Sequence, residues 1–254
     1  METIGLIAAM NQESDALIRL IKGSKRISLG QFKGFRFHCG DRSCVLIITG
    51  WGRKRAGEAT RLLLAEANPQ MLISFGIAGA VYSDLQIGDV VISTKSCVLD
   101  DGLPGQPRRL AALSGPAWKA VTEALLMEKA SVFLGTTITT HGSQVDLKRE
   151  EQFPHPVLEM ETAGIAQVAA DNKVPLVSIR SISDNPQAPI PIDLQAAVDE
   201  DDNLLTGKLF MMVMRDPKII FQSGRMLNNS RIAADNAALA LITVLKENSL
   251  IIKE

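Results

Sequence analysis

The chain has 254 residues, 46% of them apolar, which is enough to bury a full core, so a single domain over residues 1–254 is expected. Its 27 basic and 28 acidic residues give a formal net charge of −1, so it lacks the basic field that drives nonspecific binding to nucleic acid. Three cysteines without CxxC spacing argue against a disulfide framework or a zinc site and favour a reducing, cytoplasmic setting.

The first apolar run ends at Met10 and has no basic flank, so neither a signal peptide nor a membrane span is expected. Similar runs rich in Ile and Val recur along the chain and predict buried strands at residues 4–10, 44–49, 71–75, 89–93, 132–139 and 175–182. Apolar residues three and four apart predict helices at 12–21, 53–67, 116–128 and 161–171. The expected fold class is α/β, with a mixed or mostly parallel sheet flanked by helices.

The segments between and after these elements are also distinctive. Residues 100–117 are rich in Gly and Pro and predict a projecting loop that could line a pocket or an oligomer contact. Residues 185–193 contain three prolines and predict an extended loop after the last strand. A further stretch covers 203–214, and the alanine-rich residues 224–246 predict a long C-terminal helix.

Ligands of open α/β sheets bind beyond the carboxyl ends of the strands, so the residues directly after each predicted strand are the first site candidates. Glu13 follows the first strand, and Gly50-Trp-Gly-Arg53 follows the second. The third strand leads into Gly76-Ile-Ala-Gly-Ala80, and the last ends at Ser183-Asp184. These positions supply carboxylates, one cation, and glycines that let a ligand approach the backbone.

Five short motifs occur in a fixed order. They are Ala-Met-x-x-Glu at 9–13, Gly-x-Gly-Arg at 50–53, Gly-Ile-Ala-Gly at 76–79 followed by Gly-Asp-Val-Val at 88–91, Glu-Met-Glu at 159–161, and Ile-Ser-Asp at 182–184. In this order they resemble the nucleoside phosphorylase and nucleosidase superfamily, which includes the methylthioadenosine/S-adenosylhomocysteine nucleosidases. The resemblance covers roughly residues 3–185 and implies cleavage of an N-glycosidic bond.

The resemblance also implies roles for individual residues. Asp184 would donate a proton to N7 of a purine, provided that burial raises its pKa. Glu161 would stay ionised and accept hydrogen bonds from the ribose hydroxyls. Glu13 would position or activate the nucleophile, and Met160 would form an apolar floor under the sugar. The remaining substrate-binding candidates are Met10, Trp51, Ile77, Ala78, Gly79, Glu159 and Ser183.

Each carboxylate has a structural alternative. Asp184 could cap the Asn-Pro loop that follows it. Glu13 and Glu161 could be acidic residues favoured at the start of a helix. His38, His141 and His155 lack paired spacing with other ligands, so no metal is expected.

The nucleophile stays open because Ile77 stands where the methylthioadenosine nucleosidases have Ser in Gly-Ser-Ala-Gly. Phosphate, as a co-substrate, could bind the backbone N–H groups around Gly76 together with Arg53. Water could instead be activated by Glu13. No other cofactor is expected.

The C-terminal third departs from the small-nucleoside enzymes. Residues 204–221 are rich in Met, Leu and Phe, and the segment resembles the hopanoid-associated phosphorylase subgroup, which is thought to release adenine from adenosylhopane. Met adapts well to a bulky apolar group. Lys208, Arg215 and Lys218 would help the segment to contact a membrane peripherally. The alternative is a helix pair buried in the core or in a dimer contact.

The sequence therefore predicts an enzyme that cleaves a purine nucleoside, with adenine favoured as the base and a large apolar group at the 5′ carbon. Alternatives are a methylthioadenosine/S-adenosylhomocysteine nucleosidase, a small purine nucleoside phosphorylase, or a noncatalytic nucleoside- or lipid-binding relative. The resemblance also implies a homodimer or higher homo-oligomer.

Overall fold

The computed structural model describes residues 2–100, 103–140, 153–189 and 217–252. In these residues, eleven strands form one mixed sheet in the order β10-β9-β6-β11-β5-β1-β4-β3-β2, with β7 and β8 added beside β6. The strands are β1 (Thr3–Ala8), β2 (Lys25–Leu29), β3 (Phe32–Cys39), β4 (Arg42–Ile48), β5 (Met71–Ala80), β6 (Val90–Asp100), β7 (Leu103–Pro104), β8 (Arg108–Arg109), β9 (Val132–Thr139), β10 (Pro156–Glu159) and β11 (Leu176–Asp184).

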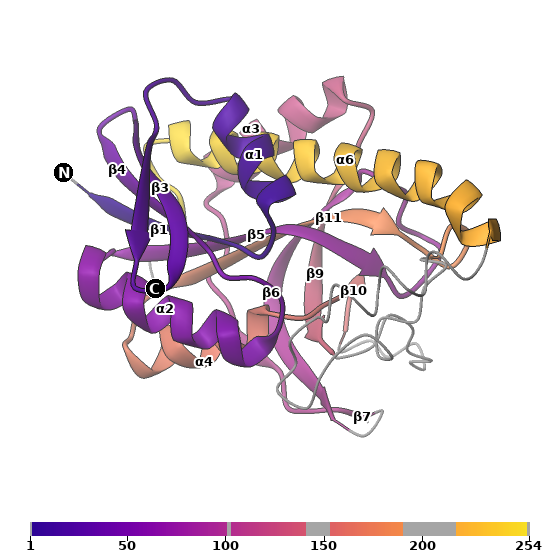
Figure 1. The fold of residues 1–254 in the computed structure, drawn as a ribbon, viewed down its shortest axis with the longest axis horizontal. Coiled ribbons are helices and arrows are strands. Elements are labelled where there is room, and N and C mark those ends of the chain that lie inside the picture. Colours follow the sequence, from indigo (N-terminus) through magenta and orange to yellow (C-terminus); the bar gives the residue numbers. More distant parts are fainter. Residues whose placement is uncertain (1, 101–102, 141–152, 190–216, 253–254) are drawn as a thin grey trace.

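Helices cover both faces of this sheet (Figure 1). They are α1 (Asn11–Arg19), α2 (Arg53–Ala67), α3 (Gly115–Met127), α4 (Thr162–Asp171) and α6 (Pro217–Lys246). Helices α1 and α3 pack against α6 on one face, whereas α2 and α4 pack together on the other. Buried alanines of α6 such as Ala234, Ala237 and Ala238 let it lie close to the sheet. The predicted α/β class with a long C-terminal helix is confirmed.

The six predicted strands all exist, as β1, β4, β5, β6, β9 and β11, but the sequence prediction missed others. Strands β2 and β3 form a hairpin on the edge of the sheet, where β3 alternates buried and exposed residues rather than forming a continuous apolar run. The sequence predicted a projecting loop over 100–117. This is wrong for β7 and β8, because both strands lie in that range and pair with β6. Each of these strands has two residues, too few for a periodic pattern to show.

Some sequence predictions concern residues that the structure does not describe, or describes only in part. The stretch 203–214, with Lys208, and the nearby Arg215 lie outside the described residues. The proline-rich segment is described as far as residue 189 and begins with a turn in which Ala188 N donates to Asn185 O. No helix in the described ranges combines the length and the apolar character needed to cross a bilayer.

The sheet folds back on itself where β5 ends. Strand β10 pairs antiparallel with the last residues of β5, with Leu158 opposite Gly79. On the other side of β5, parallel pairing with β11 shifts register between Ile182 and Asp184. The shift brings Asp184 opposite Gly79, so the ends of three strands meet around that glycine.

Candidate active site

A cavity of about 120 Å³ lies where these strand ends meet. It is lined by Ala9, Met10, Glu13, Trp51, Ile77, Ala78, Gly79, Thr140, Leu158, Glu159, Met160, Glu161, Ser183 and Asp184. All the residues that the sequence suggested for catalysis or nucleoside binding belong to this lining, whereas the phosphate candidates Arg53 and Gly76 do not. The cavity therefore brings together side chains from parts of the chain more than 170 residues apart.

Glu13 is buried in the first turn of α1 and is held by the backbone. Its Oε2 accepts hydrogen bonds of 2.9 Å from Ala9 N and Met10 N, and its Oε1 accepts one of 2.9 Å from Ile77 N. Burial raises the pKa of Glu13, and these backbone donors oppose that effect. A carboxylate offers about four acceptor positions, so three backbone bonds leave one for a ligand.

The carboxyl group of Asp184 lies against the backbone of Gly79. A Cβ at position 79 would be 2.6 Å from Asp184 Oδ2, so only glycine lets this group sit there. Ser183 Oγ donates to Asp184 Oδ1 over 2.6 Å. Burial raises the pKa of Asp184, which is the direction that a proton donor requires.

Glu161 lies at the start of α4 and is 8% exposed. Its Oε1 accepts a 2.8 Å hydrogen bond from Gly52 N, which the Gly-Trp-Gly turn presents with a φ of 103°. Burial, and next the negative charge of Glu159, raise the pKa of Glu161 to about 8. The charge of Arg180 and the N–H of Gly52 lower this pKa, but by less than burial and Glu159 raise it. The prediction that Glu161 stays ionised therefore stays a prediction.

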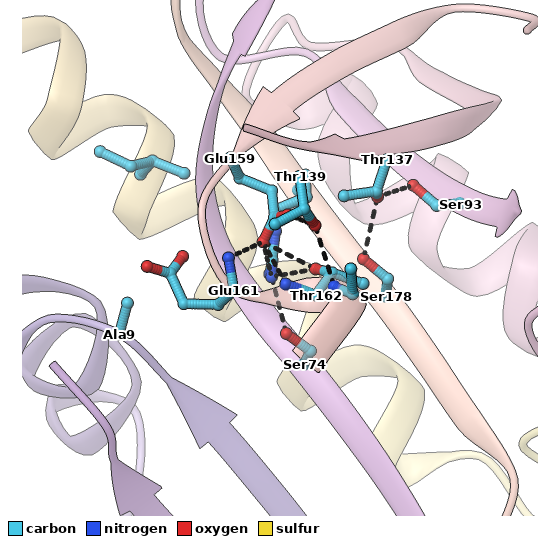
Figure 2. A network of polar contacts seen from close by, with 12 residues as sticks. Ala9, Ser74, Ser93, Thr137, Thr139, Glu159, Glu161, Thr162 and Ser178 are labelled. Atoms are coloured by element: carbon cyan, nitrogen blue, oxygen red, sulfur yellow. Dashed lines mark hydrogen bonds and ion pairs between the residues drawn. The ribbon is translucent and has the colours of Figure 1, made fainter. Parts of the chain in front are cut away.

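Glu159, two residues earlier, has a different environment although it also reaches the cavity wall. Its oxygens accept hydrogen bonds from Thr139 Oγ1 at 2.6 Å, from Thr162 N at 2.7 Å, and from Thr162 Oγ1 at 2.8 Å. The guanidinium of Arg180 forms a 3.1 Å ion pair with it. Figure 2 shows this network, with the Glu161 carboxyl group pointing away from it. Glu159 thus contributes mainly to the architecture of the site.

Arg180 is the functional candidate that the sequence prediction missed. It is 3% exposed in the middle of β11, and its Nη2 also donates to Ser74 Oγ over 2.7 Å. Its Nε is buried without a hydrogen-bond partner in the described structure. A cation inside an apolar strand is rare unless it is paired, so Arg180 between Ile179 and Ile182 was the available sequence signal.

A second, much smaller cavity of about 10 Å³ adjoins the first. Both are lined by Ala9, Glu13, Ile77 and Glu161, and the smaller one also contacts Ser74, Thr49 and Arg180. This volume matches one water molecule, and the walls offer both donors and acceptors. The structure thus forms a polar, water-sized chamber between Glu13 and Arg180.

Two backbone N–H groups near the suggested phosphate site donate to carboxylates of the protein. Ile77 N donates to Glu13, and a Cβ at Gly76 would lie 2.1 Å from Glu13 Oε1. Gly52 N, at the start of α2, donates to Glu161. Carboxylates of the protein thus take two of the backbone donors that an anion could use.

Comparisons with known proteins identify the family of this chain. The sequence matches the phosphorylase superfamily over residues 3–215. The chain belongs to that superfamily. A 5′-methylthioadenosine/S-adenosylhomocysteine nucleosidase from Oceanobacillus iheyensis is 32% identical over 199 residues, which cover 72% of this chain and 86% of the relative.

Solved structures show the same fold. The nucleosidase of the same name from Neisseria meningitidis, in complex with methylthio-immucillin-A, has a TM-score of 0.66 at 23% identity and covers 97% of this chain and 99% of its own. The futalosine hydrolase of Helicobacter pylori has a TM-score of 0.65 at 16% identity, covering 95% and 96%. The superfamily match and the nucleosidase relatives confirm the prediction of an enzyme that cleaves N-glycosyl bonds.

Proposed function

We propose that this member of the phosphorylase superfamily hydrolyses the N-glycosidic bond of an adenine nucleoside, with water as the nucleophile. The observation that carries the proposal is the chamber between Glu13 and Arg180, which has the volume of one water molecule and opens beside the cavity lined by Glu161 and Asp184. Relatives named nucleosidases and hydrolases support the same chemistry.

The leaving base would be activated by Asp184. Its raised pKa favours the protonated form, and its Oδ2 faces the cavity beside Gly79 while Ser183 holds Oδ1. Proton transfer to N7 lets the base take the electron pair of the C1′–N9 bond as that bond breaks. Acid catalysis of this kind is worth ~10² to 10⁴ in rate.

The sugar would bind at Glu161 and Met160. As positive charge develops on the ribose, the ionised form of Glu161 becomes favourable, because an anion near that charge stabilises the transition state. Gly52 N already holds one oxygen of this carboxyl group. The other oxygen is then available to the ribose hydroxyls.

Water in the small chamber would donate a hydrogen bond to the remaining acceptor position of Glu13 and accept one from Arg180 Nε. As its oxygen bonds to C1′, its proton passes to Glu13. The products are free adenine and a free ribose sugar. Phosphate fits less well, because a chamber of about 10 Å³ holds one small molecule and the nearby Ile77 N–H already donates to Glu13.

The test is an assay for adenine and sugar products with and without phosphate. Hydrolysis predicts a rate independent of phosphate and a reducing sugar as the product. Formation of a sugar 1-phosphate, or a strict need for phosphate, would overturn the choice of nucleophile. No adenine release under either condition would sink the proposal of catalysis altogether.

We also propose that the substrate carries a large apolar group at its 5′ carbon, as adenosylhopane does. Support comes from the Met- and Phe-rich sequence 204–221 and from apolar walls of the described cavity such as Leu158, Met160 and Ile77. Relative rates on methylthioadenosine and on a long-chain 5′-alkyl adenosine test this choice. Equal or greater efficiency on methylthioadenosine would favour the small-nucleoside alternative instead.

A further inference from the structure

The loop of residues 85–89, between β5 and β6, holds the end of β11 just before Asp184. Ile182 N donates to Asp89 O, and Gly88 N donates to Ile182 O, each over 2.9 Å. These bonds lie where the pairing of β11 with β5 shifts register between Ile182 and Asp184. An irregularity of this kind changes the direction in which a side chain points, and it is common beside active sites. The loop thus fixes the chain on the amino-terminal side of Asp184.

The same loop also holds the residue directly after Asp184. Asn185 is 6% exposed, and its Nδ2 donates to Leu85 O over 2.9 Å. Its Oδ1 accepts from Gln187 N over 3.2 Å and from Ala188 N over 3.0 Å. Both polar atoms of this side chain are therefore bonded to the backbone, and Asn185 is not among the described residues that line the cavity.

Asn185 performs the structural role that the sequence left open for Asp184. The sequence allowed Asp184 to cap the Asn-Pro loop, but the side chain of Asn185 accepts the N–H groups of that loop. Within the described structure, the Asp184 carboxyl group accepts from Ser183 Oγ alone. Backbone N–H groups donated to a carboxylate lower its pKa. Because Asn185 engages them, the pKa of Asp184 can stay raised, as an acid requires.

The loop is itself fastened to the core of the protein. The Asp89 carboxylate accepts the N–H groups of Gln86 and Ser131, each over 2.8 Å. Asn236 on α6 donates to Gly88 O over 2.8 Å. Asp89 and Asn236 are both buried. The loop can therefore serve as a rigid support for the residues that it contacts.

On the basis of the proposed function, in which Asp184 protonates the leaving base, we propose that Asn185 is a positioning residue. It holds the Asp184 carboxyl group at the cavity by tying the chain that follows to Leu85. Ser183 orients one carboxyl oxygen and Gly79 makes room for the other, whereas Asn185 fixes the backbone from which the side chain extends. A displacement of about 1 Å in a reacting group can cost about 10²-fold in kcat.

Two substitutions test this role. Asn185→Ala removes every side-chain contact, whereas Asn185→Ser keeps a hydroxyl that can accept an N–H of the turn but is one atom shorter than the amide that reaches Leu85 O. Both variants should lower kcat for adenine release by about 10- to 100-fold and leave KM within about threefold of wild type. A wild-type kcat in Asn185→Ser would overturn the proposal, whether or not Asn185→Ala folds.

The pH profile of kcat separates positioning from a loss of stability. Wild-type kcat should fall at high pH as Asp184 loses its proton. In Asn185→Ala, the N–H groups of the turn lack their acceptor and can donate to the displaced carboxyl group, so this fall should move about one unit to lower pH.

Val121→Ala is the control for stability. It removes buried volume on α3, and none of the described residues that line the two cavities of the candidate site lies on this helix. It should leave both kcat and the pH profile unchanged. If the profile of Asn185→Ala does not move and Val121→Ala loses as much kcat, Asn185 acts through stability alone and the proposal is wrong.

Asp184→Asn separates two kinds of negative result. If this variant keeps the wild-type rate, Asp184 is not the acid, and both its proposed role and the role of Asn185 are wrong. If it is impaired and Asn185→Ser is not, only the positioning role fails. In the double variant, Asn185→Ser should cost less than about threefold beyond Asp184→Asn, because no acid remains to be positioned. A further loss of about tenfold or more would mean that Asn185 acts on something other than Asp184.

Discussion

The carboxyl groups around the candidate active site fall into two regions with different environments. Glu159 is surrounded by donors from Thr139, Thr162, Glu161 N and Arg180. Glu161 and Asp184 face the cavity and, in the described part of the chain, each accepts from one neighbour, Gly52 N and Ser183 Oγ respectively. Protein donors thus saturate the first carboxylate and leave the other two able to interact with a ligand.

This difference distinguishes a carboxylate that supports the structure from carboxylates that can contact a substrate, although the sequence presents these residues as equivalent. Glu159 and Glu161 stand in one Glu-Met-Glu motif, yet the former pairs with a buried cation and the latter has a pKa raised to about 8. A carboxylate that is fully hydrogen-bonded has little capacity left for a substrate. The unsaturated groups are therefore the ones to test for catalysis, and the saturated one for stability.

The largest effect should come from Asp184. Asp184→Asn keeps the shape of the side chain but removes its acidic proton, so the rate of adenine release should fall by ~10² to 10⁴. Thermal unfolding should change little, because the group accepts only from Ser183 among the described residues. A rate within about threefold of wild type would contradict the role of Asp184 as an acid.

Glu159→Gln should mainly lower stability. Removing this charge leaves the guanidinium of Arg180 buried without its counter-ion, and breaking a buried pair costs about 3 to 5 kcal/mol. The free energy of unfolding in urea measures the loss. Glu161→Gln is the matched control two residues away, and it should not destabilise the empty protein, because Glu161 already favours its neutral form. Equal losses in both variants would remove the distinction between the two regions.

Gly76→Ala tests whether the position of Glu13 matters. The new Cβ would lie 2.1 Å from Glu13 Oε1, so the carboxylate must move away from the small chamber. A shift of about 1 Å in a reacting group can cost about 10²-fold in kcat. Gly115→Ala is the control, since a Cβ there meets nothing within 4 Å. Unchanged kcat in Gly76→Ala would show that Glu13 does not activate the nucleophile.

The sequence was sufficient to predict the α/β class and the carboxylates of the site, because both depend on local patterns. Buried strands such as Met71–Ala80 show as apolar runs, and Asp184 follows such a run directly. The order of the short motifs, which resembles that of a known superfamily, indicated that Glu13, Glu161 and Asp184 belong to one site. The structure places all three around one cavity.

The rest depended on contacts between distant segments. The return of β10 onto the end of β5 cannot be seen in four residues, yet it forms one wall of the site. The protonation of Glu161 depends on its burial and on where Glu159 and Arg180 lie. Arg180 was visible as a charge within a strand, but its link to Ser74, 106 residues away, exists only in the fold.

The last effect concerns pH and again separates the two regions. The folded protein holds the Glu161 proton up to about pH 8, whereas the unfolded chain releases it near the ordinary pKa of 4.5. Unfolding therefore releases a proton between these values, and stability falls as the pH rises through this window. The slope for one group is at most about 1.4 kcal/mol per pH unit.

Urea unfolding of the ligand-free protein at several values between pH 5 and pH 8 measures this slope. Glu161→Gln should show a smaller slope but not a zero one, because burial also raises the pKa values of Glu13 and Asp184. A slope that is identical in wild type and Glu161→Gln would mean that Glu161 is ionised in the empty site. In that case its interaction with a substrate would need no change of protonation.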